Sequence, residues 1–405
     1  MLTRIAWRNI WRNRVRSLIL LSSIALGVWA GIFMLSFSWG MSIQYVEMAI
    51  KGQISHIQLH HPEFKEEKKI DFAIPHASSL VEQINAIEGV QAACGRTITS
   101  GMISSPVAGA PANVFGILPD QEMAVTMMND YVVEGDYFTP ERKNQILVSE
   151  KLANKLKVKL NHKIVLTLQD VDGNITAGAF RITGIYKTRN STTDELNVFV
   201  KSSDLSPLLG LNIGELHEIA VLLKEHVALS QVYNQLKSDY PTLLVEDWRT
   251  LAPELRLVVD SFKQNMFIFM SIILLALTFG IINTMLMAVL ERVHELGVLM
   301  AIGMNKLSVF VMIMLETLYL AVIGGVCGLI LSYITIHLLG KTGIDLSAFS
   351  RGLESYGMDT LIYPALQNKQ YLEIFIMIFI AAILSAIYPA YKALKLNPVQ
   401  AIRKI

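Results

Sequence analysis

Four long apolar runs constrain the fold of this chain more than any other feature. Each is close to or longer than the roughly 20 residues that a helix needs to cross a membrane. The 405 residues are 52% hydrophobic and only 17% charged, a charge content typical of a membrane protein. The net charge of +1 gives no indication of nucleic-acid binding. We predict transmembrane helices over 18–41, 264–290, 307–339 and 371–389.

Residues 42–263 differ from these runs and predict a large α+β domain with a stalk helix, inserted after the first transmembrane helix. Short segments rich in β-branched and aromatic residues are typical of strands, and they cover 162–170, 178–187 and 195–201. Asp172-Gly173 predicts a hairpin turn between the first two. Helical spacing covers 78–87, 149–158 and 228–240. Asp247–Lys263 predicts a helix that leads directly into the second transmembrane helix.

The first 17 residues predict a basic amphipathic helix at the membrane surface. Its arginines follow i, i+4 spacing, beside two tryptophans, and they are Arg4, Arg8, Arg12 and Arg16. The alternative is a plain basic flank that orients the next helix. The first apolar run also resembles a signal peptide, but its length exceeds the usual ~7–15 apolar residues, so we expect an uncleaved anchor.

The distribution of Lys and Arg predicts the orientation of the chain. Both the N-terminal segment and the tail at 390–405 are basic, and cytoplasmic segments carry an excess of these residues. Four transmembrane helices then place 291–306 in the cytoplasm. The large domain and the loop at 340–370 would lie outside.

The sequence contains no catalytic or nucleotide-binding motif that holds. It has no P-loop and no H-E-x-x-H, so we expect no catalytic residue and no cofactor in this chain. His56, His60 and His61 cluster on a predicted strand. A metal site would need a third ligand that the local sequence does not name, and surface histidines are the alternative. We expect no metal.

Two features inside the third apolar run invite a functional interpretation. Glu316 is its one charged residue, and a membrane carboxylate is costly unless it has a function or a partner. An ion pair with an arginine of a neighbouring helix is the alternative to a transport role. Gly324 and Gly328 form a G-x-x-x-G motif that permits close helix packing, either with another subunit or as routine glycine usage.

Glu291–Lys306 is a polar interruption between two apolar runs, and it is either a turn or a docking site. A polar start of Glu291, Arg292, His294 and Glu295 precedes a short apolar body, and Gly303 gives an end signal. These features predict a helix of about ten residues along the inner membrane surface. Since the chain lacks an ATP site, a separate ATPase docking there is the economical interpretation.

These residues resemble the MacB/FtsX-type ABC transporter permeases. The resemblance rests on IAWRNIWRNRVRSLILLSSIALGV at the start, on ERVHELGVLMAIGMNKLSVF in the middle and on NPVQAIRKI at the end. It implies one plus three transmembrane helices around an extracytoplasmic domain. It also implies a dimer of permeases, formed with a second copy or a homologous permease, and two cytoplasmic ATPase subunits that carry the ATP and Mg. The expected ATPase-coupling residues are Glu291, Arg292, His294, Glu295, Gly297, Ala301 and Gly303.

Within this family, SHIQLHHPEF after the first apolar run resembles the lipoprotein-releasing branch. The expected function is extraction of lipoproteins from the bacterial inner membrane and their transfer to a periplasmic carrier. One alternative is an efflux permease for a drug or peptide, with a periplasmic adaptor. Another is an FtsX-like scaffold that activates a cell-wall hydrolase. A self-contained ion-coupled transporter is disfavoured because it would need more helices and midplane charges.

Overall fold

The computed structural model divides the chain into two compact units. It describes residues 2–12, 14–126, 128–188, 193–212, 214–224, 229–355 and 358–395. The first unit comprises Met1–Ile43, Val258–Leu346 and Leu361–Ile405 and is called the helical unit here. The second comprises Gln44–Leu257 and Ser347–Thr360 and is called the sheet domain. Each is described by itself.

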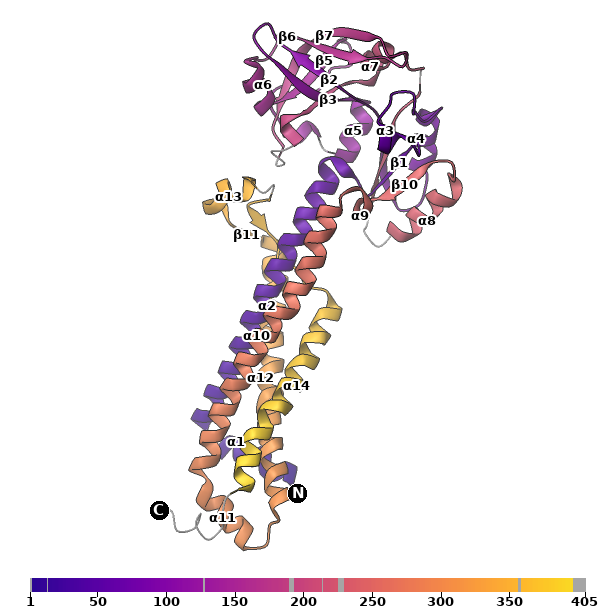
Figure 1. Ribbon diagram of the computed structural model, residues 1–405. Helices are drawn as coiled ribbons and strands as arrows, with labels where there is room; N and C mark the ends of the chain where they lie inside the picture. Colours follow the sequence, from indigo (N-terminus) through magenta and orange to yellow (C-terminus); the bar gives the residue numbers. More distant parts are fainter. Residues whose placement is uncertain are drawn as a thin grey trace. The chain divides into compact units, whose positions relative to one another are not determined.

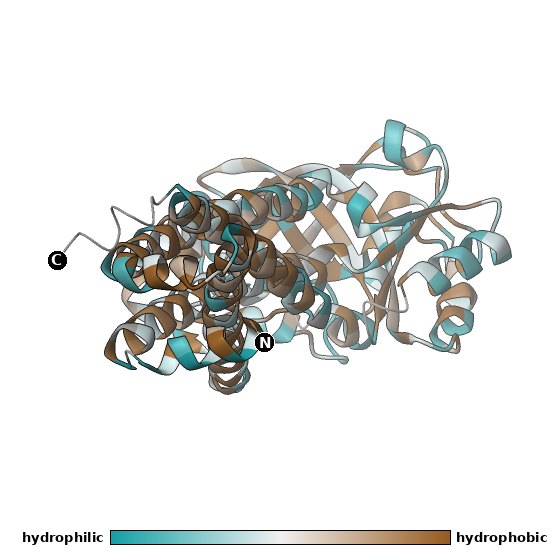
Figure 2. Cartoon of the chain, turned by 90° about the horizontal axis from the view of Figure 1, so that it is seen from below, coloured by the Kyte–Doolittle hydropathy of each residue, from teal (hydrophilic) through white to brown (hydrophobic). Residues whose placement is uncertain are grey.

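Four long helices form most of the helical unit (Figure 1), and Figure 2 shows that hydrophobic residues dominate them. Each is long and apolar enough to cross a membrane. Within the described residues, this confirms the four transmembrane helices predicted from the sequence. They are α2 (Arg14–Ala49), α10 (Pro253–Glu291), α12 (Lys306–Thr342) and α14 (Asn368–Leu394). Two shorter helices, α1 (Leu2–Arg12) and α11 (Val293–Ala301), lie at one end of them.

Glycines allow these helices to approach one another closely. A Cβ at Gly324 would lie 2.9 Å from Ile24 Cβ, and one at Gly328 would lie 2.7 Å from the carbonyl oxygen of Ala25. The predicted G-x-x-x-G motif therefore packs α12 against α2 of the same chain, so it gives no argument for a second subunit. Gly27 and Gly31 of α2 face Leu277 and Ile273 of α10 in the same way.

The sheet domain is built on ten paired strands. Six of them close into a ring through the pairings β2–β3–β8–β5–β7–β6–β2. Apolar side chains of all six, with those of α6 and α7, form a buried core inside this ring. The ring strands are β2 (Val90–Ser104), β3 (Gly109–Ile117), β5 (Gln145–Ser149), β6 (Lys163–Gln169), β7 (Ile175–Tyr186) and β8 (Asn197–Lys201).

The other strands extend the sheet beyond the ring in the order β10–β1–β9–β2. They are β1 (Ile57–His60), β9 (Glu218–Leu223) and β10 (Leu244–Asp247), while β4 (Val132–Gly135) pairs with β7. The helices of the domain are α3 (Phe64–Glu67), α4 (Ala77–Asn85), α5 (Pro119–Thr126), α6 (Glu150–Leu156), α7 (Ser202–Leu209), α8 (Leu229–Asp239) and α9 (Trp248–Leu251).

Short elements complete the description. A π-helical turn, η1 (Ile50–Ile54), precedes β1. The segment between α12 and α14 contains α13 (Ser350–Ser355) and the paired strands β11 (Ile344–Asp345) and β12 (Leu361–Ile362).

Local patterns predicted most of these elements correctly, including the hairpin of β6 and β7, where Gly173 has a φ of +83°. Two predictions were wrong. Residues 247–263 do not form one helix, because Pro253 holds Ala252 in a non-helical conformation between α9 and α10 (φ −129°, ψ 77°). The N-terminal helix ends at Arg12, so Arg16 belongs to α2, and its side chain lies outside the described residues.

Candidate functional site

The segment around α11 is a short helix with well-defined ends. Beyond its last turn Gly303 adopts a φ of +106°, which favours glycine. Its N–H donates to the Met300 carbonyl, and the Met304 N–H donates to the Leu299 carbonyl, the bonding pattern of a Schellman motif. The Asn305 side chain then accepts a 2.7 Å hydrogen bond from the Ser308 N–H at the start of α12. This turn fixes α11 against α12.

The two sides of α11 differ in burial. Leu296 and Gly297 are buried, and Leu296 packs in an apolar cluster with residues of α1, α10, α12 and α14. Met300 is half-buried against the same cluster. The opposite side is exposed and mixes charged, polar and apolar side chains, namely His294, Glu295, Val298, Ala301 and Ile302. A mixed exposed side with a buried opposite side is suited to contact with another protein.

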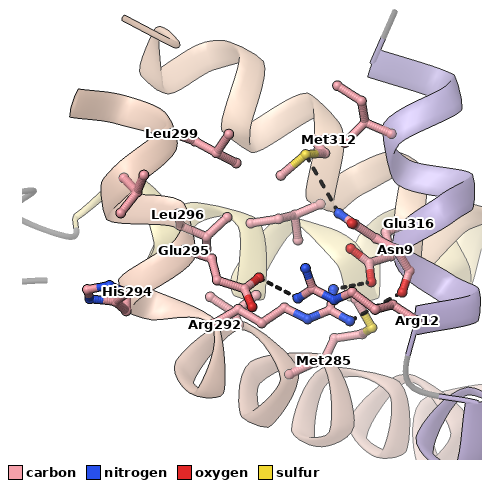
Figure 3. A pocket seen from close by; sticks show the side chains of 15 residues that line it. Asn9, Arg12, Met285, Arg292, His294, Glu295, Leu296, Leu299, Met312 and Glu316 are labelled. Atoms are coloured by element: carbon pink, nitrogen blue, oxygen red, sulfur yellow. Dashed lines mark hydrogen bonds and ion pairs between the residues drawn. The ribbon is translucent and has the colours of Figure 1, made fainter. Parts of the chain in front are cut away.

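Arg292 points toward Glu316 of α12 and Asn9 of α1 (Figure 3). Its Nη1 donates to Glu316 Oε1 at 2.9 Å, and its Nη2 donates to the backbone carbonyl of Asn9 at 3.2 Å. The Arg292 and Glu316 side chains are 15% and 9% exposed. Arg292 therefore joins four helices: it stands between α10 and α11, and it binds α12 and α1.

A second ion pair at the surface also holds α1 to α11. The Arg12 guanidinium contacts the Glu295 carboxylate, and about half of each side chain is exposed (51% and 50%). On the buried side of α1, Ala6 and Ile10 are covered. A groove of ≈ 480 Å³ lies between α1, α10, α11 and α12, and both ion pairs line it.

The structure separates the predicted coupling residues into two groups. Glu291, His294, Glu295, Ala301 and Gly303 are exposed. The other two have contacts within the chain: Arg292 binds Glu316 and Asn9, and Gly297 is buried. Asn9 was not predicted. It lies one helical turn after Ile5 and one before Arg12. The i, i+4 spacing of the arginines was the pattern that the prediction followed in this helix, and Asn9 is not part of it.

The remaining predicted residues lie in α1 and α12. Arg4 and Arg8 are exposed beside the exposed Trp7 and Trp11, as an interfacial helix would require. Glu316 has the arginine partner that one of its two interpretations required.

The polar residues of this site connect helices to one another. Its polar groups pair with one another or face solvent. Among the described residues, no group of three or more His, Cys, Asp or Glu is arranged to hold a metal ion. The arrangement presents one exposed side of α11, and Arg292 at the start of that helix binds both α1 and α12.

Two protein families match this chain. Residues 17–239 match the MacB-like periplasmic core domain, and residues 267–398 match the FtsX-like permease C-terminal region. The first match covers more than half of the chain, and the second includes α11 and α12.

Three relatives show how far the similarity extends. The lipoprotein-releasing system transmembrane protein LolC of Buchnera aphidicola is 24% identical over 64% of this chain and 63% of its own length. An ABC transporter permease of Methanocaldococcus jannaschii, MJ1507, is 24% identical over 98% of this chain and 96% of its own length. LolC of Haemophilus influenzae is 21% identical over 94% and 91%. The chain belongs to the MacB/FtsX family of ABC transporter permeases.

Proposed function

We propose that this chain is the permease subunit of an ABC transporter in the bacterial inner membrane. A separate cytoplasmic ATPase dimer binds ATP and Mg and docks on α11. A second permease, identical or homologous, completes the assembly. ATP-driven movement passes through the long helices to the sheet domain in the periplasm. The basic N-terminal helix and tail support this orientation.

The observation that carries this proposal is the two-sided structure of α11. Val298 and Ile302 are 36% and 80% exposed, although exposure of an apolar side chain to water is unfavourable in free energy. At the start of α11, Arg292 binds α12 and α1 at the same time. A force applied to α11 is therefore delivered to two further helices, because an ion pair and a backbone hydrogen bond resist separation.

Charge insertion on α11 tests the docking. Val298→Asp and Ile302→Asp should each reduce co-purification of the ATPase and its stimulation by the permease at least tenfold, because a carboxylate would be buried against the partner. Lys369→Asp is the control, since that side chain is 83% exposed at the start of α14. It should leave both readouts unchanged. Full ATPase binding by both α11 variants would exclude this surface.

For the substrate we propose lipoproteins, which the complex extracts from the inner membrane and passes to a periplasmic carrier. The support is the similarity to two LolC proteins, one of them matched over 91% of its length. Depletion of this chain followed by lipoprotein fractionation tests the proposal. Lipoproteins should accumulate in the inner membrane. Unchanged localisation with retained ATPase binding would exclude lipoproteins and favour efflux or a signalling scaffold.

A further inference from the structure

Four ionisable side chains form a buried row across the sheet domain. His60 of β1 lies opposite Glu218 of β9, and Glu218 lies opposite Arg96 of β2. Arg96 Nη1 donates to Glu218 Oε1 at 2.6 Å. On its other side, Nε and Nη2 donate to both oxygens of Glu122 of α5, at 2.9 and 2.7 Å. Each residue of the row is less than a tenth exposed.

With both glutamates ionised, the charges of this row balance when His60 carries a proton on each ring nitrogen. Burial raises the pKa of Glu122, but the positive charge and hydrogen bonds of Arg96 outweigh this and lower it overall. The two glutamates raise the pKa of Arg96 well above its ordinary value despite its burial. Two carboxylates therefore face one guanidinium. A cationic His60, whose Nε2 lies 3.8 Å from Glu218 Oε2, makes the row neutral.

The hydrogen bonds of the His60 ring point to the same state. Its Nδ1 lies 3.2 Å from the His217 carbonyl oxygen, and its Nε2 lies 3.1 Å from Gln58 Oε1. Gln58 Nε2 donates to the Ile54 carbonyl at 2.8 Å, which fixes the amide orientation and leaves its oxygen facing His60. Both ring nitrogens thus face acceptors, and only an imidazolium donates from both.

Three other histidines of the domain behave differently. His56, His61 and His217 each accept a backbone N–H at Nδ1, from Leu223, Glu63 and Ile98 respectively. In His217 the proton is on Nε2, which donates to the Ile70 carbonyl at 2.9 Å. Burial also lowers the pKa of His217. The neutral His217 is therefore an internal reference for His60.

We propose that the folded sheet domain holds His60 as an imidazolium, and that this proton locks β1 into the sheet. Loss of the proton would turn a ring-nitrogen lone pair toward Gln58 Oε1 or the His217 carbonyl. It would also leave only the Arg96 charge to balance the carboxylates of Glu218 and Glu122. The Phe64 ring, stacked on His60 at 6.0 Å between centroids, also favours the cation. The other charged groups nearby, Lys65 of α3 and Glu246 of β10, pair with each other.

Protons from solvent can reach the His60 ring through a cavity. His60, Gln58, Arg96 and Glu218 line a cavity of ≈ 880 Å³ in the sheet domain. A change of pH outside the membrane would therefore act on the row directly. The proposal concerns the sheet domain alone, and it stands whether or not the chain transports lipoproteins.

Selective isotope labelling of the full-length chain in lipid nanodiscs tests the inference. Of the nine histidines, only His60 and His217 follow a leucine. Carbonyl-13C leucine combined with fully labelled histidine therefore selects these two by NMR. His60 is then distinguished because its own next residue is another histidine. At about pH 7.5, roughly one unit above the ordinary histidine pKa, we expect both His60 ring nitrogens to be protonated and only Nε2 of His217.

A neutral His60 ring under these conditions would overturn the proposal. Gln58→Leu then tests the lock, because it removes the Nε2 acceptor. In this variant the His60 Nε2 proton should be lost at the same pH. His76→Asn is the control: it removes an exposed histidine of the same domain and keeps the His60-His61 pair, so both His60 ring nitrogens should stay protonated. Retention of the Nε2 proton in Gln58→Leu would show that Gln58 does not hold it.

Discussion

The two units of this permease each bury an arginine against glutamate, but in different settings. In the helical unit, Arg292 and Glu316 are 24 residues apart, line an open groove and share one hydrogen bond. In the sheet domain, Arg96 meets partners 26 and 122 residues away and is 2% exposed. The first arrangement joins α12 and α1 to the junction of α10 and α11. The second links β2 to β9 and α5 in the interior of the domain, so its loss should be far more costly.

Removal of Arg96 is the largest expected effect. Arg96→Met leaves Glu122 and Glu218 buried without their counter-charge, and such a loss costs about 3–5 kcal/mol. Thermal denaturation of the full chain in detergent micelles, followed by limited proteolysis of the sheet domain, measures this. Arg181→Met in β7 is the control, because that side chain is exposed. Equal stability of the two variants would contradict the assignment of Arg96 to a buried charge row.

The same experiment in the helical unit should give a smaller effect. Glu316→Gln removes the charge partner of Arg292, which keeps its hydrogen bond to the Asn9 carbonyl. We expect a loss of about 1–3 kcal/mol in micelles. Glu373→Gln in α14 is the matched control, since its ion pair with Lys369 is exposed. A loss of stability as large as that of Arg96→Met would mean that the two buried ion pairs contribute equally to stability.

The two arrangements also differ in how far the sequence predicts them. An arginine partner for Glu316 was one of two interpretations, because a short polar segment next to a transmembrane helix must lie near its first turns. Arg292 stands in that segment. The partner could be anticipated, but its direction could not. The sequence places Arg292 among solvent-facing residues, and only packing shows that it turns inward.

The charge row in the sheet domain was not predictable in this way. It depends on the register of β1, β9 and β2, whose residues are far apart in the chain. The histidine cluster attracted attention only as a possible metal site. Local signals did predict the hairpin at Gly173 and the long helices. Two visible signals were missed: the Ala252-Pro253 step that ends α9, and the second G-x-x-x-G at Gly27 and Gly31.

The smallest expected effect concerns the exposed ion pair of Arg12 and Glu295, which lines the same groove as Arg292 and Glu316. Because each side chain is about half exposed, reversal of one charge should cost only about 0.2–1 kcal/mol. The swap Arg12→Glu with Glu295→Arg should recover most of this loss, and a double-mutant cycle in micelles at low salt measures the recovery. Strictly additive losses would show that α1 is held to α11 by Arg292 and apolar packing alone. Recovery that disappears at high salt would show that exposure is what separates this pair from its buried neighbour.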